Sequence, residues 1–283
     1  MIEYNQPLYR PPAEANSVMI QATLGCSFNK CTFCTMYESK HYKVRDLQDV
    51  FNDIDKMSSF YKDTNKMFLA DGDALNMETN HIIKILEYSY LKFPKLRRVS
   101  VYASSFNLQD KSLEELKLLK EKGLTLIYYG IESGSYEVLK RIQKPISNKK
   151  MIEGLNKVYD AQIKTSVTVI LGVAGKKYSQ EHIKQTANVI NQLKVTYLST
   201  LQLMLEKQRE EKFIKNFDGE FEMLNEREML EEQKSFLEQL NPSNKVIFRS
   251  NHVSNSLALA GTIPKDKQRL IAEVSYVIKN YLL

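Results

Sequence analysis

The sequence predicts an α/β fold, a partial (β/α)6 TIM-like barrel with a mainly helical C-terminal extension. Two observations predict this fold. Short apolar runs alternate with amphipathic helical stretches, which is typical of parallel strands joined by crossover helices. Polar or glycine-containing turns follow one apolar run after another, and in such barrels the loops at the carboxyl ends of the strands build the functional site.

Six strands are expected from the apolar runs. They cover Ser17–Leu24, Lys66–Ala70, Arg98–Ala103, Leu124–Ile131, Lys164–Leu171 and Thr196–Leu205.

The intervening helices are marked by local end signals. Thr79 is expected to cap the second helix. Ser112 and Glu115 form a capping box for the next helix, and Gly123 is expected to end it. A later helix is expected to be capped near Ser147.

We expect residues 1–205 to form the barrel core and residues 206–283 to form an extension that packs on it without being an independent domain. In the extension, Asn225 and Glu228 resemble a helix cap. Val246–Phe248 is a candidate seventh strand or edge, and a last helix is expected from about Pro264 to Leu282.

Composition bounds the class of protein. With 283 residues and 43% hydrophobic content, the chain can bury a sizeable core. There is no apolar run of membrane-spanning length and no secretory signal pattern, so we expect a cytoplasmic protein without a membrane partner. The net charge of +6 comes from interspersed charges, which favours a solvated surface and gives only weak support to a nucleic-acid partner.

The most concentrated chemistry lies in the stretch Leu24–Tyr37, which holds Cys26, Cys31 and Cys34, the three cysteines of the chain. Three thiolates select zinc, Cu(I) or iron-sulfur centres. A structural zinc site needs four ligands, and His41 is a candidate fourth. A four-iron cluster usually takes four cysteines, so three would leave one iron open to a small molecule. From the residues alone, a zinc site and an iron-sulfur cluster are both possible.

This stretch resembles the signature of the radical S-adenosylmethionine (radical SAM) superfamily, which has three cysteines after the first strand of a partial barrel. The usual gaps are three and two residues, whereas here they are four and two, and the aromatic Phe33 before the last cysteine fits the pattern. The resemblance implies that Cys26, Cys31 and Cys34 bind three irons of a 4Fe-4S cluster. The amino and carboxylate groups of S-adenosylmethionine would chelate the fourth, and Phe33 would lie at the cofactor.

The turn Asp71-Gly72-Asp73 occupies the place of the Gly-Gly-Glu-like turn that contacts the methionine amino group in this family. A carboxylate pairs with an ammonium group, and glycine permits the turn. Asp73 is the preferred ligand and Asp71 the second candidate. The alternative is an ordinary turn at a strand exit.

Further turns carry cofactor candidates by the same resemblance. Glu132 and Ser133 lie in a motif that resembles the fourth-strand motif of tRNA-modifying and oxygen-independent coproporphyrinogen-oxidase groups, which implies contacts to the ribose or the methionine end. Gly172 and Val173 resemble the turn that packs against adenine, and Ser104 follows the third strand. Without this context, Ser133 or Ser135 would simply cap a helix.

Candidate catalytic residues on the substrate side are Tyr37, Tyr102 and His252, which lie near expected strand ends. Further substrate-side candidates are Gln202, Arg249 and Asn251. A lone histidine is more often a satisfied structural group than a proton carrier, and buried tyrosines usually pack.

The resemblance implies an oxidoreductase-type enzyme that reductively cleaves S-adenosylmethionine to methionine and a 5'-deoxyadenosyl radical, which removes hydrogen from an unidentified substrate. It also implies a one-electron donor protein of the flavodoxin or ferredoxin type. With three cysteines in all, no auxiliary cluster is expected, which disfavours tRNA methylthiolation. Two alternatives remain: a non-catalytic iron-sulfur carrier or electron-transfer protein, and a Cys3His zinc protein that binds RNA or a partner.

Overall fold

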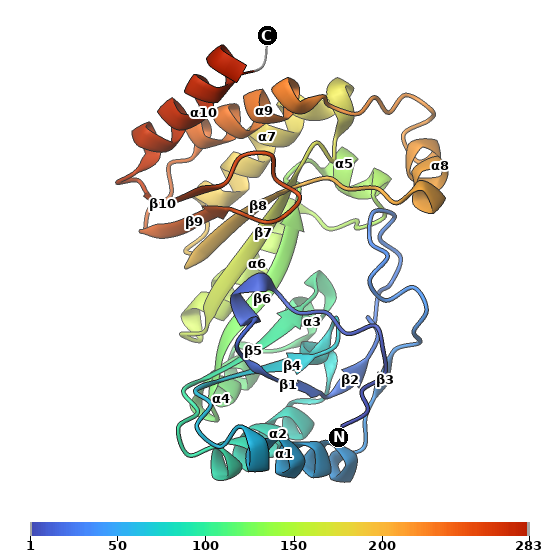
Figure 1. Ribbon diagram of the computed structural model, residues 1–283, viewed down its shortest axis with the longest axis vertical. Helices are drawn as coiled ribbons and strands as arrows, with labels where there is room; N and C mark the ends of the chain where they lie inside the picture. Colours follow the sequence, from blue (N-terminus) through green and yellow to red (C-terminus); the bar gives the residue numbers. More distant parts are fainter. Residues whose placement is uncertain (1, 282–283) are drawn as a thin grey trace. The chain divides into compact units, whose positions relative to one another are not determined.

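The computed structural model describes residues 2–281, and within them the main sheet has eight strands in the order β1-β4-β5-β6-β7-β8-β9-β10 (Figure 1). The registered pairs from β1 to β6 and from β7 to β9 are parallel, and β10 runs antiparallel to β9. The predicted fold class is therefore confirmed. The strands are β1 (Val18–Gln21), β4 (Lys66–Ala70), β5 (Arg98–Ala103), β6 (Leu124–Glu132), β7 (Lys164–Leu171), β8 (Tyr197–Gln202), β9 (Val246–Ser250) and β10 (Leu259–Ile263).

Helices connect successive parallel strands, as the alternating pattern predicts. They are α1 (Leu47–Phe60), α2 (Thr79–Lys92), α3 (Ser105–Asp110), α4 (Leu113–Glu121), α5 (Tyr136–Arg141), α6 (Asn148–Asp160), α7 (Gly175–Asn191), α8 (Lys207–Lys215), α9 (Glu226–Gln239) and α10 (Lys267–Tyr281). A small antiparallel pair, β2 (Thr23–Leu24) with β3 (Lys43–Val44), flanks the cysteine segment.

Several local predictions are confirmed by the side-chain contacts. Ser112 with Glu115 and Asn225 with Glu228 both form complete capping boxes, at the starts of α4 and α9. Gly123, with φ of 104°, follows the end of α4. Such local signals are reliable because the side chain that satisfies the exposed helix amides lies within four residues of them.

Other local predictions are wrong. The first strand does not run unbroken from Ser17 to Leu24: β1 ends at Gln21, and the chain leaves it for β2. Thr79 does not cap α2, since Glu78 is the N-cap residue and the Thr79 hydroxyl donates instead to the Glu115 carboxylate at 2.5 Å. The Thr79 hydroxyl is therefore bonded to a residue that is distant in sequence and not to the amides at the start of α2.

The chain divides into two compact units. The first comprises the residues up to Asn29, Cys34–Tyr129 and Lys157–Thr165; the second comprises Lys30–Phe33, Gly130–Asn156 and the chain from Ser166 onward. The predicted division into residues 1–205 and 206–283 stays a prediction.

The C-terminal part belongs to the second unit and contains α8, α9 and α10 with strands β9 and β10. The candidate strand Val246–Phe248 is confirmed as part of β9, whereas β10 was not predicted. Figure 1 shows α7, α9 and α10 beside one another in this unit. The last helix was predicted to reach Leu282, which lies outside the described residues. No helix within residues 2–281 is long and apolar enough to cross a membrane.

Helix α7 packs closely against the turn after β6, and Gly134 makes the approach possible. A Cβ atom at Gly134 would lie 2.4 Å from the Gln185 carbonyl oxygen and 2.5 Å from the Thr186 amide nitrogen, both backbone atoms. The Gly134 amide also donates to the Thr186 hydroxyl at 2.7 Å. Residue 134 must therefore be glycine for steric reasons.

We expect Gly134→Ala to lower the free energy of unfolding by about 3 kcal/mol, because backbone atoms of a packed helix cannot yield to an added methyl group. Urea denaturation followed by circular dichroism measures the change. Gly219→Ala is the control: its Cβ meets open space, and only its φ of 76° is unfavourable, so a loss of about 1 kcal/mol is expected. Equal losses in the two variants would contradict the steric explanation.

Candidate cofactor site

The cysteine segment starts where β1 and β4 end side by side. The register pairs Gln21 with Ala70, so the chain leaves both strands at the same level. Gly25, with φ of 70°, precedes Cys26, and its carbonyl accepts a hydrogen bond from the Gly72 amide at 3.1 Å. The segment with the first cysteine and the Asp71-Gly72-Asp73 turn are thus in direct contact.

The three cysteines are all partly exposed. Cys26 and Cys34 belong to the first unit, whereas Cys31 lies in the short Lys30–Phe33 segment of the second. There the Thr32 amide donates to the Ile142 carbonyl at 3.1 Å. Within residues 2–281 no group of three or more His, Cys, Asp or Glu side chains is arranged to hold a metal ion.

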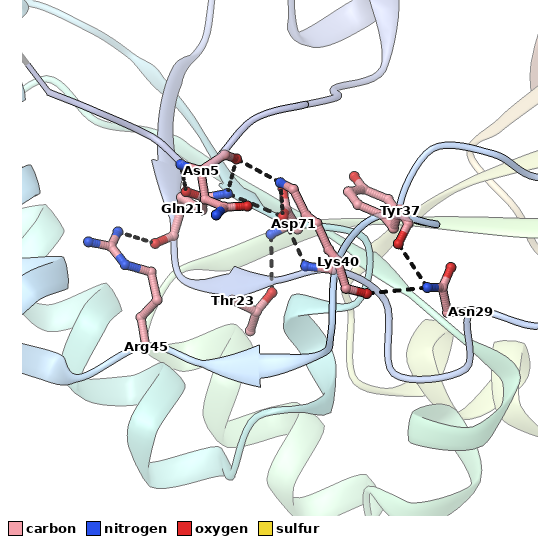
Figure 2. A network of polar contacts seen from close by, with 9 residues as sticks. Asn5, Gln21, Thr23, Asn29, Tyr37, Lys40, Arg45 and Asp71 are labelled. Atoms are coloured by element: carbon pink, nitrogen blue, oxygen red, sulfur yellow. Dashed lines mark hydrogen bonds and ion pairs between the residues drawn. The ribbon is translucent and has the colours of Figure 1, made fainter.

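Asp71 is completely buried at the centre of the polar network in Figure 2. Its Oδ2 accepts from Lys40 Nζ at 2.8 Å, from the Gly25 amide at 3.0 Å and from Gln21 Nε2 at 3.2 Å. Its own amide donates to the Thr23 hydroxyl at 3.1 Å. Asp71, the second candidate for the methionine amino group, is therefore already paired with a protein cation.

Asp73 is also completely buried, but its surroundings are different. Its two carboxylate oxygens accept from the Ser27 hydroxyl and the Asn107 side-chain amide, both neutral groups. Burial raises the pKa of Asp73 to about 6, although hydrogen bonds from Ser27, Ser104 and Asn107 oppose the rise. A buried carboxylate with only neutral hydrogen-bond donors is suited to a cationic ligand.

Ser104 was proposed as a cofactor contact, and it also has a clear local role. It is the N-cap of α3, and its hydroxyl accepts from the Asn107 amide at 3.4 Å and from Asn107 Nδ2 at 2.9 Å. The helix was not predicted. Its first turn carries Asn107 to Asp73 and so links the ends of β4 and β5 in the first unit.

Tyr37 and Tyr102 both lie in the first unit with Cys26 and Cys34. Tyr37 packs under Gly72, where a Cβ atom would lie 2.4 Å from the tyrosine ring, and its hydroxyl, like Asp71 Oδ1, has no hydrogen-bond partner in the described structure. Burial raises the pKa of both tyrosines above the usual range, and the neighbouring Cys34 charge adds to the effect. Both phenols therefore stay protonated at neutral pH and are suited to donating hydrogen bonds.

In the second unit, the strand end of β6 forms a tight turn around Glu132. Its φ is 60°, and the Ser133 amide donates to the Ile131 carbonyl at 2.7 Å across it. The Glu132 carboxylate pairs with Lys144 Nζ at 2.8 Å, and the same ammonium donates to the Gly130 carbonyl at 2.7 Å. The backbone of Glu132 thus has a conformation that is uncommon outside glycine. Lys144 stabilises this turn by binding both the Glu132 carboxylate and the Gly130 carbonyl.

A buried polar chain links the turns that follow β6 and β7. His182 Nδ1 lies 2.8 Å from the Ser133 hydroxyl, and His182 Nε2 lies 4.0 Å from Glu232 Oε1. Glu232 Oε1 accepts from the Gly172 amide at 2.6 Å, and its other oxygen accepts from the Ser179 hydroxyl. Helices α7 and α9 therefore fix two of the predicted cofactor-binding turns.

Burial determines the charge state of this chain. It raises the pKa of Glu232 to about 7 and lowers the pKa of His182 to about 4, so both shifts favour the neutral forms. For Glu232, the folded-state pKa lies above the unfolded value, so the folded protein loses stability as pH rises from about 4.5 through 7. For His182 the sign is opposite, and stability is lost as pH falls from about 6.5 through 4.

We expect Glu232→Gln to raise the free energy of unfolding at pH 8 by roughly 3 kcal/mol, because the amide keeps both hydrogen bonds without a buried charge. At pH 5 the difference should fall to about 1 kcal/mol, because the unfolded carboxyl group, with a pKa of 4.5, is still mostly ionised there. Chemical denaturation of the metal-free protein at both pH values measures this. Glu231→Gln, at an exposed neighbour paired with Arg227, is the control. A Glu232→Gln variant that is less stable at pH 8 would contradict the assignment.

The remaining predicted residues lie in the second unit. His252 Nδ1 accepts from the Ser254 amide at 3.1 Å, and burial lowers its pKa. Gln202 is hydrogen-bonded to Ser256, while Asn251 is exposed. Val173 is completely buried beside Gly172, and Phe33 is partly exposed.

Sequence reasoning missed residues that hold the candidate turns in place within each unit. They are Ser27, Lys40 and Asn107 in the first unit, and His182 and Glu232 in the second. One signal was available for Glu232. It lies three residues after Met229 and four before Phe236, on the apolar side of α9, where a charged residue is unusual. Lys40 carried no comparable signal.

The chain combines a mostly parallel α/β sheet with three cysteines between β2 and β3 and two buried carboxylates after β4, as expected of a protein that binds a metal centre at the carboxyl ends of its strands. The chain belongs to the radical SAM superfamily. The family model for that superfamily matches residues 20–190.

Curated relatives agree with this family at low identity. The heme chaperone HemW of Bacillus subtilis is 20% identical over 182 residues, covering 64% of this chain and 47% of HemW. A putative methylthiotransferase of Methanocaldococcus jannaschii is 25% identical over 171 residues, covering 55% of this chain and 35% of that protein. This chain thus spans less than half the length of either relative.

Among solved structures, coproporphyrinogen III oxidase (HemN) of Escherichia coli, a radical SAM enzyme, superimposes with a TM-score of 0.57 at 14% identity. The match covers 79% of this chain and 52% of that one. This similarity shows a shared fold. The cofactors of the superfamily, a 4Fe-4S cluster and S-adenosylmethionine, agree with the donor set of three thiols and a buried carboxylate whose hydrogen-bond donors are neutral.

Proposed function

We propose that this protein is a radical SAM enzyme that cleaves S-adenosylmethionine reductively and abstracts hydrogen from a substrate still to be identified. The observation that carries the proposal is the contact between two turns, one leading into the three-cysteine segment and the other holding Asp73. When bound and reduced, the cluster supplies the electron that splits S-adenosylmethionine into methionine and the 5'-deoxyadenosyl radical.

Cys26, Cys31 and Cys34 are assigned to three irons of the cluster. Thiolates suit iron-sulfur centres, and three protein ligands leave one iron for a small molecule. Asp73 is assigned to the methionine ammonium group, because its hydrogen-bond donors in the protein are neutral whereas Asp71 is paired with Lys40. Gly72 allows the turn between the two acids to pack on Tyr37.

The other cofactor assignments follow the superfamily pattern residue by residue. Glu132 and Ser133 are assigned to the ribose or methionine end, and the Gly172-Val173 turn to adenine. Phe33 and Ser104 are further contacts. The buried polar residues of α7 and α9 support this assignment, since His182 lies within hydrogen-bond distance of Ser133 and Glu232 accepts from the Gly172 amide.

Tyr37, Tyr102 and His252 are proposed on the substrate side. The two tyrosines keep their protons, so they would orient a substrate by donating hydrogen bonds and would not act as bases at neutral pH. Burial keeps His252 neutral, and Nδ1 is occupied as an acceptor. A flavodoxin- or ferredoxin-type protein is the proposed electron donor.

The test is anaerobic reconstitution with iron and sulfide, reduction with dithionite, and chromatography for 5'-deoxyadenosine after addition of S-adenosylmethionine. We expect a brown protein that forms 5'-deoxyadenosine. A brown protein that forms none, even with cell extract as a source of substrate, would overturn the enzymatic proposal in favour of an iron-sulfur carrier. A colourless protein with tightly bound zinc would favour the Cys3His alternative.

A further inference from the structure

A single carboxylate oxygen holds the chain on both sides of the cysteine segment. Asp71 Oδ2 accepts from the amide of Gly25, the residue before Cys26, and from the ammonium of Lys40, which follows Cys34 and Tyr37. Figure 2 shows the Lys40 ammonium beside the Asp71 carboxylate. The residues at the two ends of the segment, Gly25 and Lys40, are therefore both hydrogen-bonded to the same oxygen atom.

Lys40 is unusually buried for a lysine, and its ammonium group is hydrogen-bonded within the protein. Only 3% of its side chain is exposed, and its ammonium donates to Asp71 Oδ2 at 2.8 Å and to the Asn5 carbonyl at 2.7 Å. The ammonium also lies 5.8 Å from the centre of the Tyr37 ring. A fully buried lysine is uncommon, and the removal of one partner would leave the other charge buried without compensation.

A second contact closes the inner part of the segment. Asn29 Nδ2 donates to the Tyr37 carbonyl at 2.8 Å and to the Lys40 carbonyl at 3.4 Å, as drawn in Figure 2. Gly25, Asn29, Tyr37 and Lys40 all belong to the first unit, together with Cys26 and Cys34. The ends of the segment are therefore joined by side chains as well as by the β2 and β3 pair.

We propose that Lys40 and Asp71 form a positioning ion pair that closes the cysteine segment before the cluster binds, and that Asp71 acts on the segment and does not bind the cofactor. The ion pair restricts the conformations open to the backbone that carries Cys26 and Cys34. Less conformational entropy is therefore lost when a metal centre forms. The role in cluster assembly rests on the proposed function, whereas closure of the segment does not.

The first test uses the metal-free protein. Anaerobic alkylation of each cysteine by iodoacetamide is timed by mass spectrometry in wild type, Lys40→Met and Asp71→Asn. Opening of the segment should speed alkylation of Cys26 and Cys34 at least about tenfold in both variants. If the variants changed only the electrostatic environment of the cysteines, their effects on the alkylation rate would be opposite. Loss of the Lys40 charge disfavours the reactive thiolate form and slows alkylation, whereas loss of the Asp71 charge favours the thiolate and speeds it.

Asp53→Asn is the matched control. Asp53 is also a largely buried acid of the first unit, and it pairs with Arg45 at 2.6 Å, outside the cysteine segment. It should lower the melting temperature without speeding alkylation. Equal alkylation rates in wild type, Lys40→Met and Asp71→Asn, or equal acceleration in Asp53→Asn, would overturn the proposal.

The second test loads the cluster and compares electron paramagnetic resonance spectra of the reduced protein. We expect Lys40→Met and Asp71→Asn to bind less iron and to give altered spectra, and Lys40→Arg to recover much of the iron content because it keeps the charge. If wild type forms 5'-deoxyadenosine but the variants alkylate normally, only the ion-pair proposal fails. If the segment opens in the variants but wild type forms no cluster, only the proposed function fails.

Discussion

A Cys31→Ala variant is expected to form no stable four-iron cluster and to produce no 5'-deoxyadenosine. The chain has only three cysteines, so no other thiol can replace the missing ligand. His41 is exposed, and the described residues contain no preassembled group of metal ligands that would take over. A cluster held only by Cys26 and Cys34 would have two irons without a protein ligand.

Iron and sulfide analysis after anaerobic reconstitution measures the effect, together with the absorbance of the brown protein. Lys30→Ala, at an exposed residue of the same short segment, is the control and should keep a normal cluster. The melting temperature of both metal-free variants should match that of wild type, since both side chains reach the surface. A stable and active cluster in Cys31→Ala would show that the ligand assignment is wrong.

The parallel sheet was predictable because buried parallel strands are short, continuous apolar runs. Lys66–Ala70 and Lys164–Leu171 were predicted with the boundaries observed for β4 and β7. The capping boxes were predictable because they involve residues close in sequence. By contrast, the break after Gln21 depends on the pairing of β2 with β3, and the two β3 residues, Lys43 and Val44, lie beyond the cysteine segment and give a weak signal.

The sequence predicted which types of residue make up the candidate site, but it did not predict their ion-pair and hydrogen-bond partners. The turn with Asp71 and Asp73 stood out as two acids at a strand end. Which of the two is paired with a protein cation depends on Lys40, a lysine that is indistinguishable in sequence from the many exposed ones. The burial of Glu232 likewise depends on the packing of α9 against α7, which long-range contacts determine.

Asp73→Asn is expected to raise the dissociation constant of S-adenosylmethionine about 100-fold in the cluster-loaded protein, because it removes the charge that pairs with the methionine ammonium group. The amide should fit the fold, since it can accept from Asn107 and donate to the Ser27 hydroxyl. Isothermal titration calorimetry under anaerobic conditions measures the change in affinity.

The stability of the metal-free protein should change in the opposite direction. Because burial raises the pKa of Asp73 from 3.8 to about 6, the wild type loses stability as pH rises through this range, and Asp73→Asn does not. At pH 8 the variant should be more stable, by an amount of the order of 3 kcal/mol. Asp53→Asn should show the reverse pattern, with lower stability and unchanged affinity, because it breaks a partly buried ion pair with Arg45 that does not include the turn. An Asp73→Asn variant with normal affinity would remove this carboxylate from the cofactor site, whereas loss of both affinity and stability would indicate a structural role.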